Sequence, residues 1–132
     1  MNTKQLSDFI EALFTKTTEK EVQWDDVDKK DLYSIVSKEI NFSTVKGGFV
    51  STNKEGTKKA ILGKYNVKRY VDEEEFYYQD KYFLEINDTG NSKSILFNEN
   101  ELRHSDITKL ATLYRKIELS NSGVEETLNN WF

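Results

Sequence analysis

The residues best suited to binding a ligand are cations and tyrosines in the middle of the chain. Lysines and an arginine recur between residues 58 and 69, with tyrosines at neighbouring positions. Cations beside aromatic faces can hold a phosphate-bearing, nucleotide-like anion by charge and stacking. The alternative is structural, because lysines commonly protect a sheet from edge pairing. The candidate ligand-binding residues are Lys64, Tyr65, Lys68, Arg69 and Tyr70, and a pocket around them would be completed by Arg115 and Lys116.

The strongest acidic feature comes directly after this group. Asp72, Glu73, Glu74 and Glu75 are consecutive and repel one another, which favours a solvated turn between two strands. The functional alternative is an acidic patch that binds a basic protein partner. A nucleic-acid mimic would combine it with a second set of acids, Asp25, Asp26, Asp28 and Asp31.

Two aromatic residues, Trp131 and Phe132, stand at the end of the sequence. We expect them to dock into the core, because an undocked terminus usually frays. If they are exposed instead, they form an adhesive surface for a protein partner or for a second copy of the chain.

Few residues of the chain are suited to catalysis or to metal binding. The chain has no cysteine, which excludes disulfides, thiolate metal sites and cysteine nucleophiles. His104 is the only histidine, so it cannot build a typical metal site without other ligand types, and as a general base it needs a partner that the sequence does not identify. No phosphate-binding loop, nucleophile elbow or zinc-binding spacing occurs. We therefore expect a non-enzymatic protein without a metal or cofactor.

Charge and hydropathy restrict the partners. The net charge is −4, with acidic and basic residues interspersed, so the charge pattern gives no support for binding to duplex nucleic acid, which requires a concentrated basic surface. A local basic face is still compatible with this pattern. Charged residues interrupt the apolar positions of the first twenty residues, unlike a signal peptide or a membrane span. We expect a cytoplasmic protein with no membrane partner.

The elements that position these residues follow from hydrophobic periodicity. Apolar residues recur at helical spacing between Leu6 and Phe14 and again between Ile107 and Ile117, and a shorter amphipathic segment follows Gly123. Between them, alternating runs are separated by turns at Gly47-Gly48, Glu55-Gly56 and Thr89-Gly90. The expected strands span residues 40–45, 49–52, 60–71, 76–86 and 94–97. In the fourth of these strands, Phe83 and Leu84 point to opposite faces, which predicts contacts on both sides of the sheet.

These elements predict one α+β domain over residues 1–132. It consists of an antiparallel β-meander of about five strands packed against N-terminal and C-terminal helices. The segment from Asp25 to Ile40 has two interpretations: its acids can precede a helix, whereas Leu32 to Val36 is rich in residues that favour strands.

The sequence carries a resemblance in the order of its pieces. "LSDFIEALFTKT" is followed by "EVQW", then "YFLEINDTGN", and finally "LATLYRKIELSNSGVEETLNNWF". This order resembles small uncharacterised helix, β-meander, helix proteins of Gram-positive bacteria and their phages. The resemblance implies the same arrangement and a phage or mobile-element origin, but it assigns no catalytic residue.

Two functions are consistent with these observations. The first is a small binding protein, such as a phage inhibitor or an immunity-type protein, that acts through a protein–protein surface. The second is an oligomeric protein that sequesters an anionic, nucleotide-like ligand on the basic and aromatic sheet face.

Overall fold

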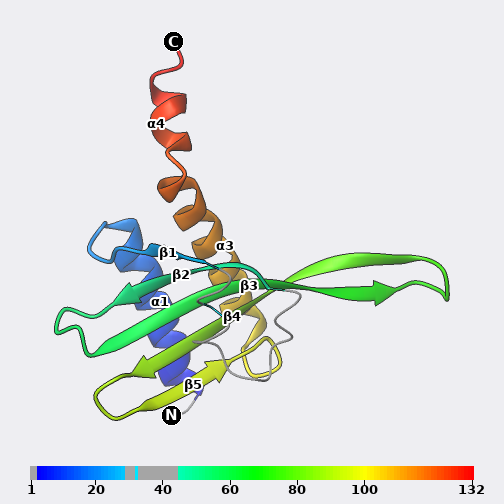
Figure 1. The fold of residues 1–132 in the computed structure, drawn as a ribbon, viewed down its shortest axis with the longest axis horizontal. Helices are drawn as coiled ribbons and strands as arrows, with labels where there is room; N and C mark the ends of the chain where they lie inside the picture. Colours follow the sequence, from blue (N-terminus) through cyan, green and yellow to red (C-terminus); the bar gives the residue numbers. More distant parts are fainter. Residues whose placement is uncertain (1–2, 29–31, 33–44) are drawn as a thin grey trace.

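The computed structural model describes residues 3–28, 32 and 45–132 (Figure 1). The elements in chain order are α1 (Thr3–Thr18), β1 (Asp25–Val27), β2 (Val45–Thr52), β3 (Lys58–Tyr70), β4 (Phe76–Asp88), β5 (Lys93–Phe97), α3 (His104–Asn121) and α4 (Val124–Asn129). The five strands form one antiparallel sheet in the order β1-β2-β3-β4-β5. The expected α+β class, with a five-stranded meander between N-terminal and C-terminal helices, is confirmed.

Helices α1 and α3 pack against the same face of the sheet, which we call the helix face. The apolar positions of both helices recur at three- and four-residue spacing, so each helix presents one stripe to the strands. A polar contact also joins the helices, because the Ser7 hydroxyl donates to the buried Asp106 carboxylate at 2.8 Å. The core on this side includes Leu6, Ile10, Leu13, Leu110, Leu113 and Ile117 from the helices with Phe49, Leu62 and Leu84 from the strands.

The opposite side of the sheet, the second face, also has an apolar core. Ile61, Phe83 and Leu96 are buried there together with Val45 and Leu32. Phe83 and its neighbour Leu84 are both fully buried and belong to different cores, which confirms the predicted contacts on both sides of this strand.

The expected turn at Gly47-Gly48 is wrong, because both glycines lie inside β2. A side chain on Gly48 would place its Cβ 3.1 Å from Cδ2 of Leu32, and one on Gly47 would place it 3.0 Å from the hydroxyl of Tyr114. Glycine is therefore used here for the close approach of other side chains and not for a turn.

The segment beginning at Asp25 also differs from the expectation. Asp25 and Asp26 lie in the short edge strand β1, opposite Val50 and Phe49 of β2, and not at the start of a helix. Charged side chains are common on an edge strand because they discourage further pairing. Leu32 donates its backbone N–H to the Asp28 carbonyl at 3.0 Å, as in a helical turn. The expected strand at 40–45 and the rest of the ambiguous segment to Ile40 fall almost entirely outside the described residues.

Candidate functional site: the β3–β4 arm

The most distinctive feature of the sheet is the length of its β3–β4 hairpin. The two strands pair continuously from Lys58 with Asp88 to Tyr70 with Phe76. The pairing of β2 with β3 begins at Tyr65, and the pairing of β5 with β4 ends at Leu84. Beyond these points the described residues add no further strand, and the hairpin continues as a two-stranded ribbon that projects from the sheet (Figure 1). We call residues 66–80 the arm.

Aromatic side chains cover the arm. Tyr70, Phe76 and Tyr78 share the helix face of the ribbon and are 64%, 47% and 57% exposed. The ring centroids of Tyr70 and Phe76 are 5.9 Å apart, and those of Phe76 and Tyr78 are 5.6 Å apart with an edge-to-face arrangement. Tyr77, on the opposite face, is 56% exposed. The arm therefore presents a preformed aromatic cluster to its surroundings.

The arm separates the predicted ligand-binding residues into two groups. Lys64, Lys68 and Tyr70 face the helix side, whereas Tyr65 and Arg69 face the other side. The Lys68 ammonium lies 4.5 Å from the centroid of the Phe76 ring. On the other side, Arg69 Nε donates to the Gln79 side-chain oxygen at 2.8 Å. The five residues therefore do not converge on one pocket.

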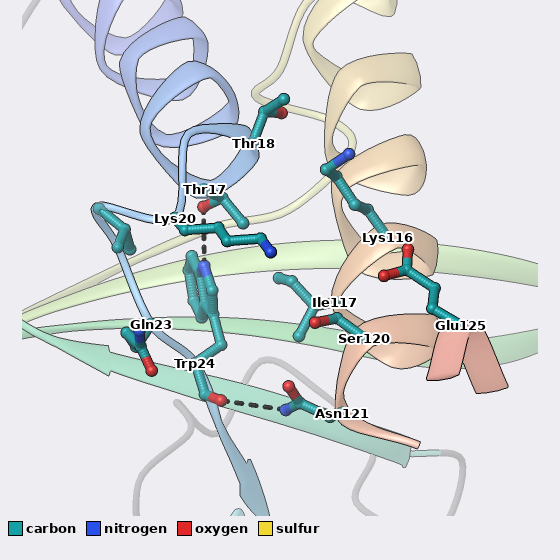
Figure 2. Close-up of a pocket in the computed structure, with 11 residues that line it drawn as sticks. Thr17, Thr18, Lys20, Gln23, Trp24, Lys116, Ile117, Ser120, Asn121 and Glu125 are labelled. Carbon is teal, nitrogen blue, oxygen red and sulfur yellow. Dashed lines mark hydrogen bonds between the residues drawn. The ribbon is translucent and has the colours of Figure 1, made fainter. Parts of the chain in front are cut away.

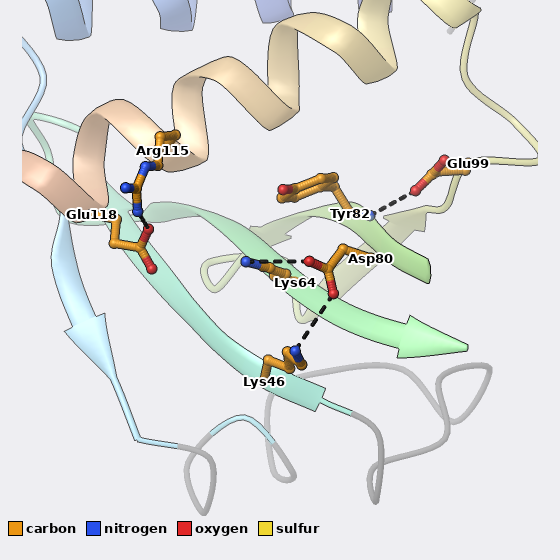
Figure 3. Close-up of polar contacts among 7 residues, drawn as sticks. All are labelled: Lys46, Lys64, Asp80, Tyr82, Glu99, Arg115 and Glu118. Carbon is orange, nitrogen blue, oxygen red and sulfur yellow. Dashed lines mark hydrogen bonds and ion pairs between the residues drawn. The ribbon is translucent and has the colours of Figure 1, made fainter. Parts of the chain in front are cut away.

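The base of the arm is polar and internally paired (Figure 3). Lys46 and Lys64 each approach the Asp80 carboxylate at 3.6 Å, so two cations share one anion. Where β5 has ended, the Glu99 carboxylate accepts the Tyr82 backbone N–H at 2.8 Å and satisfies a donor on the β4 edge.

Arg115 and Lys116 do not complete a binding pocket with the arm. Arg115 is paired with Glu118 on the same helix at 2.5 Å (Figure 3). Lys116 lines a separate pocket beside Trp24. Nearby, burial raises the pKa of Tyr114 to about 12, so its phenol stays neutral beneath the Lys64 ammonium.

The four consecutive acids form the tip of the arm, as the sequence predicts. Asp72 accepts the backbone N–H groups of Glu74 and Glu75 at 2.8 Å and 2.9 Å. These two hydrogen bonds lower the pKa of the Asp72 carboxyl below its usual value. All four side chains are exposed, so the tip presents concentrated negative charge.

The C-terminal aromatic pair does not dock into the core, and this expectation is wrong. Trp131 and Phe132 are 69% and 114% exposed, and Leu128 of α4 is 65% exposed. The last α3 residue of the core is Ile117, and Gly123, with φ of 77°, redirects the chain into α4. Helix α4 then leads away from the sheet (Figure 1).

A pocket of about 290 Å³ lies between the ends of α1 and α3 (Figure 2). The indole N–H of Trp24, on its wall, donates to the Thr17 hydroxyl at 2.9 Å, and the Asn121 amide donates to the Trp24 carbonyl at 3.0 Å. These bonds attach the segment before β1 to both helices, so Thr17, Trp24 and Asn121 have a structural role in the pocket wall.

A larger groove, of about 800 Å³, lies beside α1 at the end of the sheet remote from the arm. Phe9, Ala60 and Ile86 contribute apolar surface to it. Lysines at its rim include Lys54 and Lys59, and acidic residues such as Asp25 also line it.

Residues suited to binding a metal ion do not cluster in the described part of the chain. In that part, no group of three histidine or acidic side chains is placed to hold a metal ion. His104, the first residue of α3, is exposed, and the nearby Asp106 carboxylate accepts a hydrogen bond from the Ser7 hydroxyl. None of the described helices combines the length and the apolar character that crossing a membrane requires.

Comparisons of the chain with protein-family models, with curated proteins and with solved structures give no match.

Proposed function

We propose that the chain is a non-enzymatic binding protein that contacts another protein through the β3–β4 arm. The observation that carries this proposal is the cluster of Tyr70, Phe76 and Tyr78, which is exposed on a ribbon that has left the sheet. A two-stranded ribbon is marginally stable in water unless its faces are covered. Contact with a partner would cover the aromatic face and stabilise the arm.

The arm has the properties of a recognition element. Tyrosines and arginines are enriched among the residues that dominate binding energy at protein interfaces. The Phe76 ring contacts both Tyr70 and Tyr78 and lies under the Lys68 ammonium, so the side chains lose little conformational freedom on binding. A fitting partner is apolar at its centre and carries basic groups opposite the acidic tip. An inhibitor or immunity-type protein would act through a surface of this kind.

A binding site for an anionic ligand has less support at this position. Lys64 is paired with Asp80, and Lys68 already interacts with Phe76. Arg69 and Tyr65 lie on the other face of the ribbon. A small anion would therefore meet neither a concave site nor a convergent set of cations.

Site-specific photo-crosslinking tests the proposal. A photoreactive phenylalanine derivative replaces Tyr78 on the arm or, as the matched control, Ile95, which is 53% exposed on β5. We expect a discrete protein adduct in the producing cell from position 78 and none from position 95. The adduct should disappear when Tyr70 and Phe76 are both changed to Ser. Equal labelling at 78 and 95, or an adduct that survives the serine changes, would contradict the proposal.

A further inference from the structure

We infer that the protein bound by the arm is a second copy of this chain, and that the two arms lie antiparallel about a two-fold axis. This inference rests on the proposed function, because it identifies the partner of the same surface. It comes from the order of charges and rings along the arm, which makes the surface complementary to itself when one copy is reversed.

The arm and its base are divided into three zones. On the helix face, which also carries the aromatic cluster, the described part of the base has three cations, Lys46, Lys64 and Lys68. Two carboxylates lie beside them, Asp80 between Lys46 and Lys64 and Glu99 at the β4 edge, so cations outnumber anions there. The aromatic cluster of Tyr70, Phe76 and Tyr78 follows. The tip carries only acids, from Asp72 to Glu75. In a two-fold interface, each zone contacts the zone that lies equally far on the other side of the axis.

When the two-fold axis passes near position 69, each of the three zones lies against a complementary zone of the other copy. The cross-strand pair of Lys68 and Tyr78 then lies against the pair of Tyr70 and Phe76 from the other copy, so rings meet rings and an ammonium meets a ring face. Residue 73 lies four residues from the axis, about 14 Å at 3.4 Å per residue. Lys64 and its neighbours lie at nearly the same distance on the other side. Each acidic tip therefore reaches the basic base of its partner.

The alternative parallel alignment is unfavourable, because it would place four acids against four acids and base against base.

The area of the interface limits the strength of the antiparallel dimer. The overlap from residue 64 to residue 74 is about 34 Å long and two strands, about 10 Å, wide. This is about 340 Å² per copy, which is below the size of a standard stable interface. The dimer should therefore be reversible and sensitive to salt.

A charge-exchange experiment tests the pairing. One variant reverses the base with Lys46→Glu and Lys68→Glu, and the other reverses the tip with Glu73→Lys and Glu74→Lys. Sedimentation velocity over a concentration series measures the self-association of the native chain, of each variant and of the equimolar mixture, and circular dichroism confirms that each variant is folded. We expect each reversal alone to weaken self-association at least tenfold. The mixture should recover it, because reversed tips then meet reversed bases.

Two results would overturn the inference. One is a mixture that associates no better than its components. The other is an adduct from position 78 whose mass differs from twice the 15.5 kDa of one chain. The second result would leave the proposed function intact, since the arm would still contact a protein. The absence of any adduct at position 78 would contradict both.

Discussion

Among the glycines, Gly63 is the one at which an added side chain would meet the closest neighbour. It lies opposite Phe83 in the β3–β4 pairing, and the fully buried Phe83 ring lies across it on the second face. An added Cβ would be 2.0 Å from Cζ and 2.2 Å from Cε1 of this ring. Without the ring, alanine should stabilise a strand by about 0.5–1 kcal/mol relative to glycine. With it, overpacking should dominate and lower the free energy of unfolding of Gly63→Ala by about 1–3 kcal/mol.

A double-mutant cycle in urea measures this contact. Phe83→Leu removes the part of the ring nearest Gly63 and should by itself destabilise the chain by about 1–2 kcal/mol through lost packing. In that background Gly63→Ala should cost much less, with a coupling energy of about 1–2 kcal/mol. If the two changes instead add to within about 0.5 kcal/mol, the close contact between Gly63 and Phe83 does not limit this position.

Three further predictions follow from burial and charge. Glu85 is 2% exposed and accepts a hydrogen bond from the Ser94 hydroxyl, and burial raises the pKa of its carboxyl in the folded state. A carboxyl whose pKa is higher in the folded than in the unfolded chain stabilises the fold at pH values below the unfolded-state pKa. This stabilisation is lost as the pH rises through the folded-state pKa. Glu85→Leu should therefore raise the free energy of unfolding at pH 7 by about 1–2 kcal/mol and flatten its decline with pH; urea titrations showing an unchanged slope with pH would contradict this. Changing the exposed Trp131 and Phe132 to Ala should alter the free energy of unfolding by less than about 0.5 kcal/mol, and a larger loss in the same titrations would mean that the pair is docked. Glu73→Cys introduces one cysteine into a chain that has none, so a nitroxide label can be attached there. In an antiparallel dimer the two labels should lie about 27 Å apart along the ribbon, as measured by double electron–electron resonance. Adjacent labels would indicate parallel arms.

The long, regular elements could be predicted from sequence because one periodicity determines each of them. The helical stripe from Leu6 to Phe14 lies within α1, and the alternation around Phe83 correctly places side chains on both faces of β4. Periodicity does not show that Gly47-Gly48 lies inside a strand and not in a turn. These glycines are explained by contacts with Leu32 and Tyr114, which are remote in sequence. Strand β1 was missed because three residues are too few to establish an alternation.

The candidate site was predictable in composition and not in shape. The cations, tyrosines and acids of the hairpin are visible in the sequence, and the acids from Asp72 to Glu75 do form its tip. The projection of the arm depends on where β2 and β5 stop pairing, at Tyr65 and Leu84, and the sequence carries no local signal for either point. By residue type alone, Phe76 and Tyr78 would be assigned to a core. They are exposed because no strand among the described residues pairs with the ribbon beside them.

Backbone amide hydrogen exchange, followed by mass spectrometry at a low and at a high protein concentration, tests the role of the arm most directly. In the isolated chain, amides of a two-stranded ribbon should exchange faster than those of the central sheet, because the ribbon opens locally. We expect a higher concentration to slow exchange in residues 64–82 and to leave exchange in α1 and in residues 124–132 unchanged. Protection that appears at residues 124–132, or an arm whose exchange is the same at both concentrations, would contradict this expectation.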